Sequence, residues 1–136
     1  PTIITQALTQ DVIPLGNLEA RRDLTFVSDT VEGFLRAAQV PGVEGETFNL
    51  GAGKEVSIGD LAQTILDLVG RPLRIEVDPA RLRPEKSEVQ RLLSDNRLAG
   101  ERLDWRPQVD LQSGLARTLA WIQDHLDRYR PSQYQL

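Results

Sequence analysis

Residues 47–62, TFNLGAGKEVSIGDLA, give the clearest structural signal in the chain. An alternating apolar segment at 47–50 leads through a Gly-x-Gly turn into an amphipathic helix, and Gly70 supplies a natural helix terminator. A second alternating segment follows at 73–77. The order of strand, helix and strand predicts two neighbouring parallel strands joined by a crossover helix. This stretch therefore favours an α/β fold.

The Gly-x-Gly turn also resembles the opening of a dinucleotide-binding fold, in which glycines let backbone amides approach a pyrophosphate. Val56 stands where that fingerprint needs its third glycine, and Ser57 with Asp60 has the spacing of a helix capping box. A structural turn is the favoured interpretation and a dinucleotide site the alternative. We therefore assign no cofactor-binding residue in this chain.

Hydrophobic periodicity predicts the remaining elements. Short strands are expected at 12–15 and 24–27, on either side of Arg21 and Arg22. Helices are expected at the amino terminus, from Ser28 or Asp29 to Pro41 with Val31, Phe34, Leu35 and Ala38 facing inward, from Asp95 to Leu103, and from Asp110 to Tyr129. The predicted fold class is a small mixed α/β domain over 1–129, with short strands, several helices and a polar tail at 130–136.

Composition excludes several classes of function. The 136 residues carry a net charge of −4, which disfavours nucleic acid as a partner. Without cysteine and with one histidine, His125, the chain offers no metal site that we can assign. No apolar run is long enough to span a membrane, so a cytoplasmic protein is expected. The chain opens on a proline within a helical pattern, as expected of a piece of a longer protein.

Composition leaves carboxylate, arginine or hydroxyl chemistry, and the placement of arginines is the most informative signal among these. A planar guanidinium can hold phosphate oxygens through two parallel hydrogen bonds, and Arg22 and Arg83 lie beside a predicted strand and in a long polar loop. Spacing alone also allows both to be solvated surface residues. Neither Tyr129 nor Tyr134 is followed four positions later by lysine, so we assign no catalytic residue.

Three segments carry a family resemblance. Residues 13–34 resemble the family segment LGN…RDFxxVxDxVxGF. Together with residues 48–62 and 83–107, in the right order, they are similar to NAD-dependent epimerases and dehydratases of the extended short-chain dehydrogenase/reductase family. The sequence departs from this pattern at Arg97 and Leu98, and at Asp104, where glycine is common. The resemblance implies the C-terminal, substrate-binding portion, with the Rossmann domain missing.

The resemblance also implies an activity for the parent protein. Full-length relatives bind NAD in the missing N-terminal domain and a nucleotide-sugar (NDP-sugar) between the two halves, and they oxidise C4 of the sugar transiently. The RPxxSEV form at 83–89 is most similar to nucleotide-sugar 4,6-dehydratases. The chain alone would hold no cofactor and would be catalytically inactive.

By the same resemblance, five residues are expected to bind the substrate. Arg22 and Arg83 match the arginines that hold the diphosphate. Ile13 and Leu15 match the strand whose backbone and side chains line the base, and Glu88 matches the acidic residue that reaches the ribose hydroxyls.

Two other functions stay open at this point. The chain could be a free-standing nucleotide-sugar-binding or regulatory module, or a small α/β scaffold whose arginines are only solvated. If the missing Rossmann domain is the natural partner, a face of this chain should be apolar and uncovered, and self-association through that face is a further expectation.

Overall fold

A computed structural model describes residues 1–84 and 87–129. It shows a mixed α/β fold, as the sequence predicted, in which the chain divides into two compact units that are both discontinuous in sequence. Unit 1 comprises residues 1–20, 57–89 and 115–136, and unit 2 comprises residues 21–56 and 90–114. The expectation of one nucleotide-sugar-binding domain over 1–129 stays a prediction.

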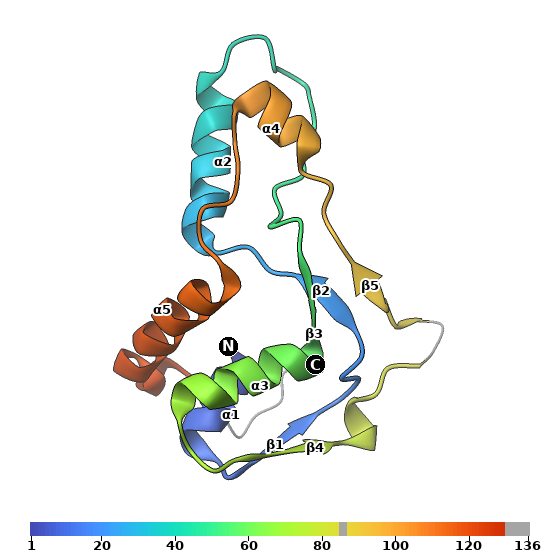
Figure 1. Cartoon of the computed structure of the whole chain (residues 1–136), viewed down its shortest axis with the longest axis vertical. Coiled ribbons are helices and arrows are strands. Elements are labelled where there is room, and N and C mark those ends of the chain that lie inside the picture. The colour runs from blue at the N-terminus through green and yellow to red at the C-terminus, as the bar shows by residue number, and fades with distance from the viewer. Residues whose placement is uncertain (85–86, 130–136) are drawn as a thin grey trace. The chain divides into compact units, whose positions relative to one another are not determined.

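Unit 1 is built on a two-stranded parallel sheet. Strand β1 (Val12–Leu15) pairs with β4 (Arg74–Val77), with Ile13 opposite Ile75, and the two lie side by side in Figure 1. Helices α1 (Thr2–Thr9) and α3 (Ile58–Val69) and the later part of α5 (Leu111–Asp124) complete the unit. Their apolar residues form one core: Ile4, Ala7, Ile13, Leu15, Ala62, Ile65, Leu66, Leu119 and Ile122.

Local signals placed the ends of α3 and the start of α5 correctly. The Ser57 hydroxyl accepts the Asp60 amide at 3.0 Å, which caps α3 as predicted. Gly70 ends the helix in the left-handed conformation, with φ 69°. The Asp110 carboxylate accepts the Ser113 amide at 2.9 Å and so caps α5.

Unit 2 contains a second, three-stranded sheet with the strand order β3-β2-β5. Strand β2 (Arg21–Asp23) is parallel to β5 (Arg91–Leu92), and β3 (Glu55–Ser57) lies on its other side. Helices α2 (Val27–Gln39) and α4 (Arg97–Leu103) pack side by side in this unit (Figure 1). A small core of Val43, Ala99, Leu103 and Trp105 lies beneath them.

Three strand predictions were wrong. The strand expected at 24–27 lies at Arg21–Asp23, and Val27 already belongs to α2. Residues 47–50 form no strand; Phe48 and Leu50 instead pack against the Trp105 core. Strand β4 therefore pairs with β1, and not with the segment before Gly51. The hydrophobic pattern showed which segments are extended, but pairing depends on residues that are distant in sequence.

Helix α2 presents to solvent the face that was predicted to be buried. Val27, Val31, Phe34 and Leu35 are 50 to 68% exposed, and Ala38 is exposed as well. The buried residues are Asp29 and Gly33. A Cβ atom on Gly33 would lie 2.4 Å from Leu50, so the packed face of the helix is the one without bulky side chains.

The last helix is shorter than predicted. Helix α5 ends at Asp124 and continues as a 3₁₀ turn, η3 (Leu126–Arg128). The backbone amide of His125 donates to Ile122, three residues back, which tightens the chain at that point. Leu126 and Tyr129 still pack against the core of unit 1, so the apolar periodicity was correct although the helical geometry was not.

Candidate functional site

The carboxyl end of the unit 1 sheet carries the loop that contains Arg83. The Asp78 amide donates to the carbonyl of Leu15 at 2.7 Å, which extends the pairing of β1 and β4 by one residue. Asp78 then caps a 3₁₀ turn, η1 (Pro79–Arg81), and pairs with Arg81 at 3.1 Å. Because the strands are parallel, both end at the same edge, where α/β folds place ligands. Arg83 follows two residues later and is exposed.

Gly16 permits the close approach of this loop. A Cβ atom on Gly16 would lie 2.5 Å from the backbone carbonyl oxygen of Arg81. The contacting atom belongs to the backbone and cannot move aside as the end of a flexible side chain would. Position 16 therefore requires a glycine. This accounts for the glycine of the LGN motif in physical terms.

We expect Gly16→Ala to lower the free energy of unfolding by about 1 to 3 kcal/mol, the usual cost of overpacking. The matched control is Gly59→Ala in α3, whose Cβ would meet nothing closer than 3.5 Å. That variant should be neutral or more stable by up to about 1 kcal/mol, because alanine is the better helix former. Urea unfolding followed by circular dichroism measures both. Equal stability of the two variants would contradict the role given to Gly16.

The structure places Ile13 and Leu15 in the core. Their side chains are 0% and 6% exposed, because β1 is covered by the helices of unit 1. The expectation that these side chains line the base is therefore corrected, and contact through the backbone of β1 stays a prediction. Glu88 is half-buried in the loop beyond Arg83, and its contact with a ribose stays a prediction too.

Arg22 lies in the middle of β2 in unit 2. Its side chain is half-buried, and its Nη1 donates to the Arg21 carbonyl at 2.7 Å. Side chains alternate between the two faces of a strand, so Arg22 lies on the face opposite Arg21 and Asp23. Arg21 pairs with Glu55 of β3 at 3.8 Å. Arg22 and Arg83 belong to different units, and their meeting at one diphosphate stays a prediction.

Asp23 is a structural centre that sequence reasoning missed. Its carboxylate accepts three backbone amides: Ala52 at 2.8 Å, Gly53 at 3.0 Å and Ser94 at 3.1 Å. Gly53 adopts φ 69°, a conformation that favours glycine. The amides of the Gly-x-Gly turn thus bind a carboxylate of this chain. The structure supports the structural turn over the dinucleotide fingerprint.

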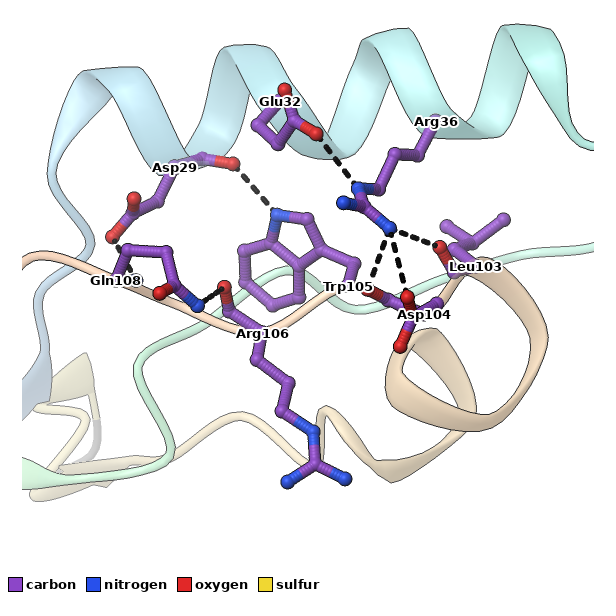
Figure 2. A network of polar contacts seen from close by, with 8 residues as sticks. All are labelled: Asp29, Glu32, Arg36, Leu103, Asp104, Trp105, Arg106 and Gln108. Atoms are coloured by element: carbon purple, nitrogen blue, oxygen red, sulfur yellow. Dashed lines mark hydrogen bonds and ion pairs between the residues drawn. The ribbon is translucent and has the colours of Figure 1, made fainter.

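Asp29 and Trp105 form a second polar centre, shown in Figure 2. The indole Nε1 of Trp105 donates to the Asp29 carbonyl at 2.8 Å. The Asp29 carboxylate accepts the amides of Gln108 and Val109, both at 3.0 Å. Trp105 is 1% exposed and Asp29 is 5% exposed. Together they tie the start of α2 to the segment that leads into α5.

Arg36 extends the same network at the C-terminal end of α4. Its guanidinium bonds to Glu32 at 2.7 Å and to the Leu103 and Asp104 carbonyls (Figure 2). The hydrogen bond to Glu32 raises the pKa of Arg36. Asp104 ends α4 with φ 49°, the left-handed conformation that explains why glycine is common there in the pattern.

An open cavity of about 1090 Å³ lies within unit 2. Charges of both signs line it: Lys54, Glu55, Arg97, Glu101, Arg106 and Asp110. Arg97 is engaged with Asp95 at 2.6 Å, and this hydrogen bond lowers the pKa of Asp95 to about 2. Because the cations and acids are balanced, the lining favours no particular ligand charge.

Among the residues that the structure describes, no three histidine, cysteine or acidic side chains gather as a metal site would require. No helix in the described part of the chain has the length and apolar character needed to cross a bilayer.

The sequence model of the family described as GDP-mannose 4,6 dehydratase matches residues 1–118. The chain belongs to this family. The prediction from the residue motifs, that the chain is the C-terminal part of an extended short-chain dehydrogenase/reductase of the epimerase/dehydratase type, is thereby confirmed. Asp23, Asp29 and Trp105 all lie within the matched range.

Individual relatives in the family agree in sequence and in structure. The UDP-glucose 4-epimerase of Mycolicibacterium smegmatis is 39% identical over 109 residues, which cover 80% of this chain and 33% of that protein. The epimerase Mth375 of Methanothermobacter thermautotrophicus superposes with a TM-score of 0.86 at 32% identity, covering 97% of this chain and 39% of that one. The UDP-glucose 4-epimerase of Thermotoga maritima, solved with UDP-glucose, superposes with a TM-score of 0.79 at 26% identity over 91% of this chain and 38% of that one. The chain therefore spans roughly a third of the length of the curated relatives it matches.

Proposed function

We propose that this chain is the nucleotide-sugar-binding portion of an NAD-dependent epimerase or 4,6-dehydratase, and that Arg22 and Arg83 hold the substrate diphosphate. The observation that carries the proposal is that each arginine lies close in sequence to a residue held by specific backbone contacts. Arg22 adjoins the anchored Asp23, and Arg83 lies two residues beyond Arg81, whose backbone packs on Gly16. Two guanidiniums on well-held segments can fix a dianion and so orient its sugar.

We further propose that NAD binds outside these residues. The Gly-x-Gly turn does not fit a dinucleotide, because its amides at Ala52 and Gly53 donate to Asp23. The sequence also has no Tyr-x-x-x-Lys pair to move a proton during hydride transfer. The chain alone would therefore bind substrate without turning it over. We also propose that the parent protein is cytoplasmic.

The exposed face of α2 supports a partner for this chain. Val27, Val31, Phe34 and Leu35 form an apolar stripe of a kind that monomers usually cover. We propose that the dinucleotide-binding domain of the parent protein covers it, because the matched stretch makes up only 33% of the length of the Mycolicibacterium smegmatis relative. Without that domain, self-association through the stripe is expected.

The proposal is tested by titrating the chain with UDP and GDP in a calorimeter. Both Arg22→Ala and Arg83→Ala should weaken binding by about 1.5 to 3 kcal/mol, the range for a hydrogen bond to a charged group. Saturable NAD binding below millimolar concentration would contradict the assignment of the cofactor to another domain.

The control for charge is Arg74→Ala on β4, an exposed arginine of unit 1 whose nearest acid, Glu76, is 3.8 Å away. It should leave the affinity for both nucleotides unchanged. If Arg74→Ala weakens binding as much as Arg22→Ala and Arg83→Ala do, the two arginines contribute only general positive charge, and the diphosphate site is wrongly placed.

A further inference from the structure

Asp23 has a role that follows from the strand it belongs to. Strand β2 has three residues and its neighbour β5 has two, so the pairing of these strands provides few hydrogen bonds. We propose that Asp23 is a positioning residue: it fixes β2 and so holds Arg22 in the orientation that binds the diphosphate. This inference rests on the proposed function, because it requires that Arg22 binds that group.

The three bonds of Asp23 reach two segments that are remote from it. Ala52 and Gly53 belong to the turn before β3, and Ser94 lies just beyond β5, after Leu93. Asp23 thus fastens the end of β2 to both of its neighbours in the sheet. Hydrogen bonds to a carboxylate are stronger than those between neutral groups, so these bonds add substantially to the short pairing of β2 with β5.

Asp23 acts through Arg22 and does not itself face the ligand. Neighbouring side chains on a strand point to opposite faces, and Asp23 shares its face with Arg21, which pairs with Glu55. A diphosphate held by Arg22 therefore lies on the other side of the sheet. The carboxylate would also repel a dianion if the two were in contact.

Gly51 shows how closely this anchor is packed. A Cβ atom there would lie 2.2 Å from Ser94 Cβ and 2.8 Å from Asp23 Oδ2. Asn96 holds the same turn by donating from its side chain to the Gly51 carbonyl at 2.8 Å. Gly51→Ala therefore disturbs the anchor by crowding Ser94 and the Asp23 carboxylate, without changing the chemical identity of Asp23.

A loosened β2 would present Arg22 in several orientations, of which one binds. If that orientation falls to about a fifth of the population, the apparent affinity falls about fivefold. Asp23→Asn keeps the size of the side chain and loses its charge and one acceptor. We expect it to weaken UDP and GDP binding by about fivefold or more, and Gly51→Ala to act in the same direction.

The experiment measures nucleotide affinity by calorimetry and thermal stability by circular dichroism. The proteins compared are the unaltered chain, Asp23→Asn, Gly51→Ala, Arg22→Ala and the double variant Asp23→Asn/Arg22→Ala. The matched control is Asp29→Asn, because Asp29 also accepts backbone amides in unit 2 but belongs to α2 and bonds to Gln108 and Val109, outside β2 and its neighbouring strands. We expect Asp23→Asn and Asp29→Asn to lower the melting temperature, and only Asp23→Asn to weaken binding. In the double variant, Asp23→Asn should add no further loss of affinity, because Arg22 is already absent.

The outcomes separate the inference from the function on which it rests. If Arg22→Ala leaves the affinity unchanged, or the unaltered chain binds neither nucleotide, the proposed function fails and this inference fails with it. If Arg22→Ala weakens binding but Asp23→Asn does not, only the positioning role is wrong. Equal loss of affinity in Asp29→Asn, or an additive loss in the double variant, would reduce Asp23 to a general stabiliser and overturn the inference.

Discussion

Trp105→Ala should lower the free energy of unfolding by about 3 to 5 kcal/mol, the range for removing a buried large aromatic side chain. Trp105 is 1% exposed and is the largest side chain in the core of unit 2. Its removal leaves a cavity beside Ala99 and Leu103 and also deprives the Asp29 carbonyl of its indole donor. Urea unfolding followed by circular dichroism gives the change.

The second tryptophan provides the control. Trp121 is 47% exposed and stacks on His125 at a centroid distance of 4.3 Å. Trp121→Ala should cost about 1 kcal/mol or less, because surface substitutions leave little cavity. A loss for Trp121→Ala as large as that for Trp105→Ala would mean that burial in unit 2 does not set the stability of the chain.

Asp29→Ala is expected to have the next largest effect, a loss of about 2 to 4 kcal/mol. The substitution leaves the amides of Gln108 and Val109 without an acceptor, and each unmade bond costs about 1 to 3 kcal/mol. The carboxylate also lies in the first turn of α2, where negative charge is favourable. Thermal unfolding by calorimetry measures the loss.

Glu32→Ala is the matched control for Asp29→Ala, because it removes the same charge from the same helix. Glu32 pairs with Arg36 at 2.7 Å at the surface, and exposed pairs contribute about 1 kcal/mol or less. Similar losses in the two variants would show that the charge of α2, and not the amide bonds to Asp29, stabilises unit 2.

Features encoded locally were predictable from the sequence. Strand β1 was predicted with its observed bounds, and the helix cap at Ser57 and the terminator at Gly70 were correct. Each of these depends on residues within a few positions of one another. The apolar residues of α2 were recognised as well, but the orientation of the helix was not, because its buried face depends on the packing of Gly33 against Leu50, which is distant in sequence.

The polar centres could not be predicted, because their partners are distant. Asp23 bonds to amides 29, 30 and 71 positions away, and Asp29 bonds to amides 79 and 80 positions away. Nothing in the sequence indicates which backbone amides will bond to these carboxylates. The one available signal was that both aspartates stand inside the motif at 13–34, where acidic residues without a catalytic partner need a structural explanation.

The interleaving of the two units also governs the order in which the chain can fold during synthesis. The core that contains Ile4 and Ile13 is closed by Leu119 and Ile122 of α5. Unit 2 likewise cannot bury Val43 until Trp105 has been made. Neither unit can therefore mature as its first segment leaves the ribosome, and contacts this remote in sequence slow folding. We expect nascent chains that stop before Trp105 to remain protease-sensitive in both units. Protection of unit 1 should appear in a later step, once α5 is available.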